Sequence, residues 1–232
     1  MSSAPVLSFA DAGEAADLAA FLGRLLHYDK AAAVRLQAQS GGQALAVFGR
    51  PPSFEVLAIR TARLLKPYEN GIDDALDVTV SAGELLDSVD ESGATATVPA
   101  AVTGPPWAGV LPPRGGWRRV EGFPAADELR GLVKTAVGEF RGRVDGLAAE
   151  ERTRAALDRI GRDIWSREIL LDGGEAVPVR VAHAAVSLGF LRGPSVDLLA
   201  AGAWLRLRTA YGSVAVRQGA AAGLGGLGVM PA

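Results

Sequence analysis

Two histidines, His27 and His183, are the side chains best suited to acid–base chemistry near neutral pH. His27 precedes Asp29 by two residues, so these two groups and His183 form one candidate acid–base set. Both histidines also have structural interpretations, which we favour. His27 ends a predicted helix, where an imidazolium stabilises the last carbonyl groups. His183 lies in an apolar helical stretch, which suits a position in a core or subunit interface.

Metal and cofactor chemistry finds little support in the residue types. The chain has no cysteine, which excludes thiolate zinc sites, iron–sulfur clusters and cysteine nucleophiles. It has no glycine-rich nucleotide motif, and neither histidine has a partner at metal-ligand spacing, so we predict no metal and no cofactor. Asp73, Asp74 and Asp77 are oxygen ligands of the kind that Mg²⁺ or Ca²⁺ prefers, but their spacing fits no EF-hand loop. We favour a solvated acidic face there.

Residues 103–117 combine proline and glycine with the two residue types that dominate binding hot spots, tryptophan and arginine. Proline and glycine hold a loop in shape, so we predict a binding surface in this segment. The candidate residues in this segment and the two positions after it are Trp107, Arg114, Trp117, Arg118 and Arg119. An equally weighted interpretation is that both indoles fill the junction between the two halves of the chain.

The charges are distributed unevenly along the chain. Eight acids and no basic residue occur from Glu69 to Glu91, whereas five arginines and one acid follow Ala176. Such separation suits self-association or a charged protein partner. Nucleic acid is not expected as a partner, because the formal net charge is −2 and phosphate binding needs surplus cations.

Periodicity predicts an α+β fold with an antiparallel sheet in the N-terminal half. Apolar residues recur at helical spacing over residues 11–27, with Asp11 as N-cap and Glu14 completing a capping box. Alternation or apolar runs predict strands over residues 33–39, 43–48, 54–65, 75–80 and 95–98, with a turn at Asn70-Gly71 and a short helix opened by Ser81 and Glu84.

The C-terminal half is expected to hold helices plus short terminal strands. Pro124 is placed at the first position of a helix that runs to Phe140, and Gly189 ends a short apolar helix. The other predicted elements are a helix over residues 150–165 and strands over 169–171, 176–179, 204–209 and 213–216. The glycine-rich residues 219–232 are expected to be mobile.

The length of 232 residues suits one large domain or two small ones. The segment 103–117 is the predicted boundary, giving an N-terminal α+β domain over 1–116 and a helix-rich domain over 117–232, unless the two are continuous. No apolar run is long enough to span a membrane and no signal peptide pattern is present, so we expect a cytoplasmic protein.

Four segments resemble a family of uncharacterised proteins that is confined to actinobacteria. They are residues 27–37 (HYDKAAAVRLQ), 112–117 (PPRGGW), 179–191 (VRVAHAAVSLGFL) and 204–214 (WLRLRTAYGSV). The likeness extends from about residue 15 to residue 217, and the 21 arginines against 3 lysines agree with it. The resemblance implies no activity.

These observations favour a non-enzymatic binding or regulatory protein that acts through protein–protein contacts. The first alternative is a small hydrolase or transferase that uses a carboxylate and a histidine. The second is a DNA-binding regulator, in which the helix before Gly189 and a helix starting at Pro194 form a helix-turn-helix. A cleft that holds a histidine and an acid would indicate the enzyme, and a continuous arginine face would indicate the DNA binder.

Overall fold

The computed structural model describes residues 4–52, 54–65, 75–171 and 173–218. The first half of the chain contains β1 (Val6–Ser8), α1 (Ala12–Tyr28), β2 (Ala33–Ala38), β3 (Ala44–Gly49), β4 (Leu57–Arg63), β5 (Leu76–Ser81), α2 (Ala82–Asp87), β6 (Val89–Asp90) and β7 (Thr95–Thr97). After a 3₁₀ turn over Pro106–Gly109, the second half contains β8 (Arg118–Val120), α3 (Ala126–Asp145), α4 (Arg154–Trp165), β9 (Glu168–Leu170), β10 (Ala176–Pro178), α5 (Val179–Ser187), β11 (Asp197–Ala201), β12 (Trp204–Thr209) and β13 (Gly212–Arg217).

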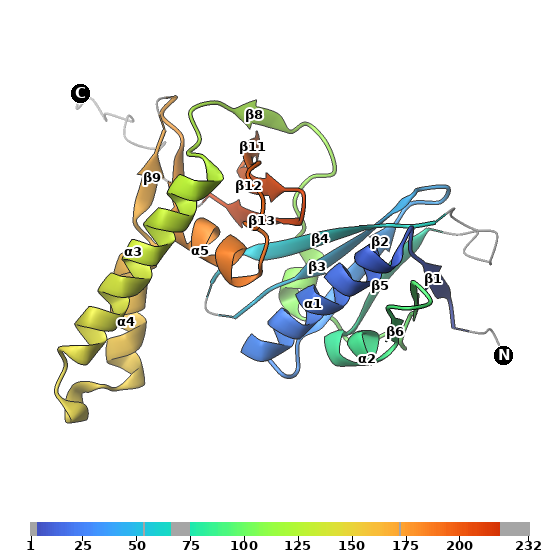
Figure 1. Cartoon of the computed structure of the whole chain (residues 1–232), viewed down its shortest axis with the longest axis horizontal. Coiled ribbons are helices and arrows are strands. Elements are labelled where there is room, and N and C mark those ends of the chain that lie inside the picture. The colour runs from blue at the N-terminus through green and yellow to red at the C-terminus, as the bar shows by residue number, and fades with distance from the viewer. Residues whose placement is uncertain (1–3, 53, 66–74, 172, 219–232) are drawn as a thin grey trace, which may run out of the picture.

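One eight-stranded antiparallel sheet joins the two halves, in the order β5-β2-β3-β4-β13-β12-β11-β8 (Figure 1). Its seam is the pairing of β4 with β13, where Ala58 lies opposite Val214. The predicted α+β class with an antiparallel sheet is confirmed. The terminal strands of the second half extend the sheet of the first half, and the predicted division at residues 116 and 117 stays a prediction.

Helices cover one face of the sheet. Strand alternation turns Leu36 and Val47 toward α1, whose buried residues include Leu18 and Phe21. On the other side of the seam α5 packs against β12 and β13, and both α3 and α4 pack against α5. The main apolar core therefore lies between this face and the helices.

The start of α1 is tied to the sheet by a buried ion pair. Asp11 is the N-cap, as predicted, and its carboxylate accepts from the backbone N–H of Glu14. The Glu14 carboxylate does not complete the capping box. It binds Arg60 of β4 at 2.8 Å instead, with the Arg60 side chain only 5% exposed, and Arg63 at 2.7 Å. A buried guanidinium needs this partner, because an unpaired buried charge is strongly destabilising.

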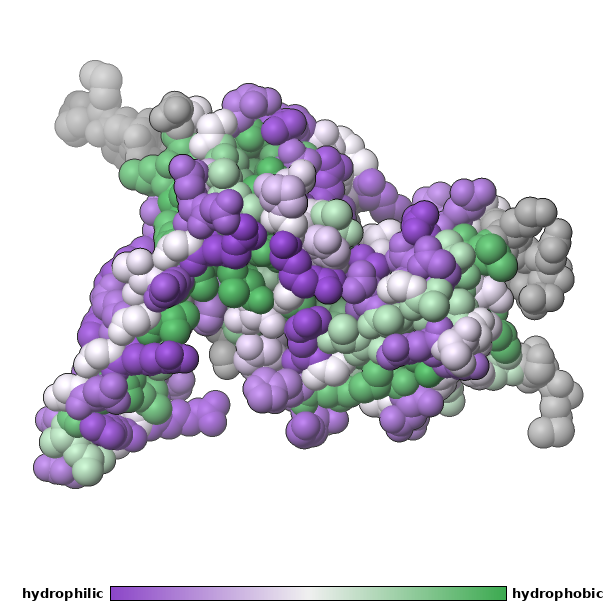
Figure 2. Space-filling model, in the orientation of Figure 1, coloured by the Kyte–Doolittle hydropathy of each residue, from purple (hydrophilic) through white to green (hydrophobic). Residues whose placement is uncertain are grey.

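The α3–α4 pair projects from the body of the molecule as an arm (Figure 1). Figure 2 shows hydrophilic side chains along its surface. Two boundary predictions were wrong here. Ala125 is the N-cap of α3, so Pro124 precedes the helix, and α4 begins at Arg154 because the Thr153 hydroxyl caps it.

The helix-turn-helix interpretation is wrong in its second helix. The residues after Pro194 form β11, because the apolar run at Leu198 and Leu199 pairs with both β12 and β8 in the sheet. Gly189 follows α5 with a φ of +73°, as its predicted place after the helix end requires.

Some predictions fall outside the described residues. They are the turn at Asn70-Gly71, the acids Glu69, Asp73 and Asp74, and the tail over 219–232. Of the part that the structure describes, none of the helices combines the length and apolar character that crossing a membrane requires.

Candidate binding site on the second face of the sheet

The second face of the sheet is crossed by residues 103–117, which we call the strap. Beneath it lies a small apolar cluster formed by Phe48, Leu57, Ile59 and Ala215. Strand alternation places these side chains on the face opposite the helices. Trp107 and Leu111 of the strap pack on this cluster together with Trp204 of β12. The strap is therefore attached across the seam between the two halves.

Arg35 of β2 fastens the strap to the sheet. Its guanidinium donates a hydrogen bond to the carbonyl of Ala108 in the strap. The same group binds both carboxylate oxygens of Asp77 in β5, at 2.7 and 2.9 Å. The hydrogen bonds from Arg35 lower the pKa of the Asp77 carboxyl below its ordinary value. Asp77 is thus held ionised, and it orients the arginine that holds the strap.

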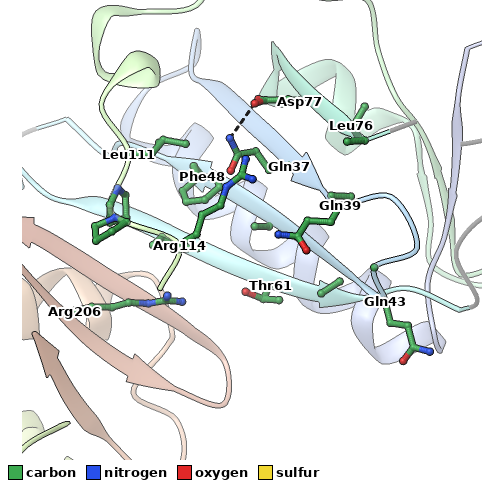
Figure 3. A pocket seen from close by; sticks show the side chains of 18 residues that line it. Gln37, Gln39, Gln43, Phe48, Thr61, Leu76, Asp77, Leu111, Arg114 and Arg206 are labelled. Atoms are coloured by element: carbon green, nitrogen blue, oxygen red, sulfur yellow. Dashed lines mark hydrogen bonds between the residues drawn. The ribbon is translucent and has the colours of Figure 1, made fainter. Parts of the chain in front are cut away.

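A polar groove of about 470 Å³ lies between the second half of the strap and strands β2, β3 and β4 (Figure 3). Its polar lining residues are Gln37, Gln39, Gln43, Thr61, Asp77, Arg114 and Arg206. Arg114 extends from the strap toward Gln37, and Arg206 extends from β12 (Figure 3). Cations therefore enter the groove from two separate segments.

Arg206 is the unusual group of the polar groove. Its side chain is half-buried, and its Nε atom is buried without a hydrogen-bond partner. Among the described residues it takes part in no ion pair, and its guanidinium lies 5.8 Å from the centre of the Trp117 ring. Burial lowers its pKa, and the charge of Arg208 does so further. By contrast Arg208, two residues on, binds Asp197 at 2.8 Å.

A second hollow, which we call the arginine pocket, lies beside the first half of the strap and has a volume of about 500 Å³. It is lined by Arg50, Glu55, Val56, Leu57, Pro106, Trp107, Val110, Arg180, Trp204, Ala215, Val216 and Arg217. The two hollows have no lining residue in common. The polar groove and the arginine pocket are thus separate concave sites.

The structure places the five predicted binding residues at separate positions on the strap and β8. Trp107 lies in the apolar cluster, Arg114 lines the polar groove, and Trp117 stands beside Arg206. Arg118 and Arg119 lie on opposite faces of β8, because neighbouring strand residues alternate. They bind Glu175 at 2.7 Å and Asp197 at 3.3 Å respectively. Their role in binding stays a prediction.

Neither His27 nor His183 lines the polar groove or the arginine pocket, whereas Asp29 lines a further hollow of about 410 Å³ that shares Arg50 and Trp107 with the arginine pocket. His27 is in ring contact with Tyr28, Tyr28 with Phe54, and Phe54 with His183. No hydrogen bond joins either histidine to an acid within the part of the chain that the structure describes, and Asp29 accepts from the backbone N–H of Ala31 instead. Within the same residues, no group of three or more histidine, aspartate or glutamate side chains is placed to hold a metal ion.

The predicted charge separation is partly neutralised within the chain. Of the arginines after Ala176, Arg180 binds Glu55 at 3.4 Å, Arg192 binds Asp17 at 2.8 Å, and Arg208 binds Asp197. Arg206 and Arg217 enter no ion pair among the described residues, and each lines one of the two hollows. In the sequence Arg206 is only one of the five arginines that follow Ala176, and it was not among the predicted binding residues. The strict alternation of β12 was the signal that places it on one face with Trp204 and Arg208.

Two family models match the chain, one after the other. Residues 2–109 match a "Domain of unknown function (DUF8010)", and residues 112–221 match a "Domain of unknown function (DUF8185)". The first match ends and the second begins within the strap. These matches agree with the resemblance to an uncharacterised family, whose restriction to actinobacteria stays a prediction. No curated protein matches the chain.

Among solved structures, the chain is similar to two crystal structures of the DNA polymerase sliding clamp from Pseudomonas aeruginosa, one of them with a ligand. The TM-scores are 0.48 and 0.46, and the sequence identity is 15% in both. The alignments cover 92% and 94% of this chain, which spans 64% of the length of each clamp chain. The family matches describe the chain as two successive segments, each of which matches a domain of unknown function.

Proposed function

We propose that this is a non-enzymatic binding protein whose polar groove receives an extended acidic segment of a partner protein. The observation that carries the proposal is Arg206, a half-buried cation with a buried, unpartnered Nε atom and no ion pair within the described chain. A buried cation without a counter-ion costs free energy, and a ligand carboxylate would recover it. A carboxylate also matches the guanidinium fork, which can donate two parallel hydrogen bonds.

The other groove residues suit a peptide. Arg114 is exposed and lines the same groove as Arg206, so the groove offers a bound segment a second cation. Amide and hydroxyl side chains such as Gln43 and Thr61 can hydrogen-bond to main-chain N–H and C=O groups, whatever the ligand sequence. The apolar floor at Phe48 and Ile59 provides desolvated surface for a side chain.

The groove is poorly suited to acid–base catalysis. Asp77 is the one carboxylate among the described residues that line it, and its bidentate bonds to Arg35 keep it ionised and engaged. A general acid or base needs a pKa near the working pH and a free position facing the substrate. Both histidines lie elsewhere. Binding is therefore the chemistry that the groove side chains support best.

Binding of a fluorescent decapeptide rich in glutamate, compared with the same peptide carrying glutamine, tests this proposal. Removing a hydrogen bond to a charged group costs about 1.5–3 kcal/mol, so Arg206→Gln should raise the Kd for the glutamate peptide by roughly 10- to 150-fold. Arg208→Gln is the matched control, because Arg208 is on the same strand and face but is already paired. It should change the Kd by less than about twofold.

Two outcomes would refute the proposal. Equal affinity for the glutamate and glutamine peptides would show that the groove does not select charge. Equal weakening by Arg206→Gln and Arg208→Gln would show general attraction to a basic surface. In the second case raising the salt concentration should remove binding to the wild type and both variants alike.

A further inference from the structure

The arginine pocket lies at one end of the β4–β13 seam, separate from the polar groove. Its floor comes from Leu57 of β4 and Ala215 of β13, which belong to the apolar cluster under the strap. Its walls come from the first half of the strap, the end of β3, the start of β12 and the start of α5. Residues far apart in sequence therefore form a site that exists only when both halves are folded together.

The arginine pocket carries more positive than negative charge. Arg50, Arg180 and Arg217 line the pocket, and Glu55 is the one acid among the described residues that line it. A terminal nitrogen of Arg180 lies 3.4 Å from the Glu55 carboxylate, while the Nε atom of Arg180 is buried and has no hydrogen-bond partner among the described residues. Arg50 and Arg217 are exposed and form no ion pair with any described residue. Two of the three guanidinium charges thus have no counter-ion, which matches a phosphate group of about −1.5 to −2.

The pocket also contains two indole rings. Trp107 and Trp204 both line it, and both pack on the apolar cluster, which fixes their positions. Each remains half-exposed, so part of the ring is available to a ligand. Stacking of a planar base on a tryptophan ring tolerates any base, because each has a π-face. A volume of about 500 Å³ is in the usual range for sites that hold a small organic ligand.

We propose that the arginine pocket binds a mononucleotide, with the base stacked on Trp107 or Trp204 and the phosphate held by Arg50 and Arg217. An acidic peptide would satisfy the arginines but leave the indoles unused, and an apolar ligand would leave the arginines unpaired. A ring joined to a phosphate uses both parts of the pocket. This site is independent of the polar groove and departs from the expectation of no nucleotide site drawn from sequence motifs alone.

Isothermal titration of the full chain tests the pocket with adenosine 5′-monophosphate, adenosine, ribose 5-phosphate and inorganic phosphate. The nucleotide should bind at least about tenfold more tightly than either fragment, because only it reaches both the indoles and the arginines. Its binding should also quench tryptophan fluorescence. If adenosine 5′-monophosphate binds no more tightly than ribose 5-phosphate, the pocket is a simple anion site and the proposal is wrong. The proposal is also wrong if the nucleotide binds no more tightly than adenosine.

Variants locate the site. Arg217→Gln and Arg50→Gln should each weaken nucleotide binding by about tenfold and spare the fold, since both residues are exposed and unpaired. Arg206→Gln, in the polar groove, should leave nucleotide binding unchanged, and Arg217→Gln should leave binding of the glutamate peptide unchanged. These crossed results separate a failure of this site from a failure of the proposed function. Nucleotide affinity that is unaffected by Arg217→Gln and Arg50→Gln would place the ligand elsewhere and refute the assignment.

Discussion

The imidazole of His183 lies stacked on the indole of Trp165, with 4.0 Å between the ring centres and 21° between the ring planes. Phe54 contacts the same imidazole at 5.1 Å between ring centres. Burial lowers the pKa of His183 to about 4, from an ordinary value of 6.5. At neutral pH this residue is therefore an uncharged aromatic side chain in the contact between α4 and α5.

The first prediction is that His183 makes the protein less stable at mildly acidic pH. Between pH 6.5 and about 4 the unfolded chain binds a proton at this residue and the folded chain does not, so stability falls as pH drops through this window. The limiting slope is ~1.4 kcal/mol per pH unit, and solvent screening of the partly exposed ring should reduce the total loss of stability to roughly 1–2 kcal/mol. Urea unfolding at several pH values measures this loss.

The variant His183→Leu should make the free energy of unfolding depend less on pH between 6.5 and about 4, whatever its effect on stability at pH 7. The carboxyls with lowered pKa values, such as Asp77, lose their contribution only at lower pH. A slope that is the same in the wild type and His183→Leu would show that another group is responsible.

The second prediction concerns the attachment of the strap by Arg35. Arg35→Gln removes the hydrogen bond to the Ala108 carbonyl and the bidentate pair with Asp77, so the strap should open locally. We expect trypsin to cleave faster after the exposed Arg114, and the whole protein to lose about 1–2 kcal/mol of stability. Arg208→Gln, which also breaks an ion pair on this face, should leave the cleavage rate unchanged. Equal rates in Arg35→Gln and the wild type would mean that the apolar cluster alone holds the strap.

Local patterns predicted most of the elements, but not their partners. The capping of α1 by Asp11 and the alternation in β2 and β12 depend on neighbours in sequence, and they were confirmed. The strand β11 was missed, because four consecutive apolar residues carry no period and only its pairing with β8 and β12 explains them. The β4–β13 seam joins residues about 150 positions apart, which no local pattern encodes.

The candidate site was also only partly predictable from the sequence. Composition alone drew attention to the strap, since proline, glycine, tryptophan and arginine are unusual together. The importance of Arg206 follows from what lies around it, namely the absence of a carboxylate partner among the described residues and the nearby Trp117 ring. Those relationships arise from tertiary packing. For the same reason the sequence could not show that Arg118 and Arg119 have acid partners of their own.

The third prediction is self-association that depends on charge. Exposed acids surround α2 in the helix layer, namely Glu84, Asp87, Asp90 and Glu91, whereas Arg114 and Arg217 lie on the second face. A contact between these faces of two copies should weaken with salt, since the Debye length falls from ~10 Å at 0.1 M to ~3 Å at 1 M. Sedimentation velocity at both salt concentrations should show more assembly at low salt. A monomer in all conditions contradicts the prediction, and assembly indifferent to salt excludes its electrostatic cause.

The last prediction separates the two strap tryptophans. Trp107 packs on the buried cluster at the seam, whereas Trp117 belongs to neither apolar cluster among the described residues and donates to the Pro113 carbonyl at 3.0 Å. Truncating a packed aromatic residue costs ~3–5 kcal/mol when it is fully buried, so Trp107→Ala, at a half-buried position, should lose about 2 kcal/mol.

Trp117→Ala should instead lose less than about 1 kcal/mol of stability but weaken binding of the glutamate peptide at least fivefold, because the indole lies beside the Arg206 guanidinium and restricts its position. Urea unfolding and peptide titration on both variants measure the two effects independently. If Trp117→Ala unfolds the protein as readily as Trp107→Ala, both indoles fill the junction between the halves. If it leaves peptide affinity unchanged, Arg206 is held by its strand alone, and the ring contributes nothing to recognition.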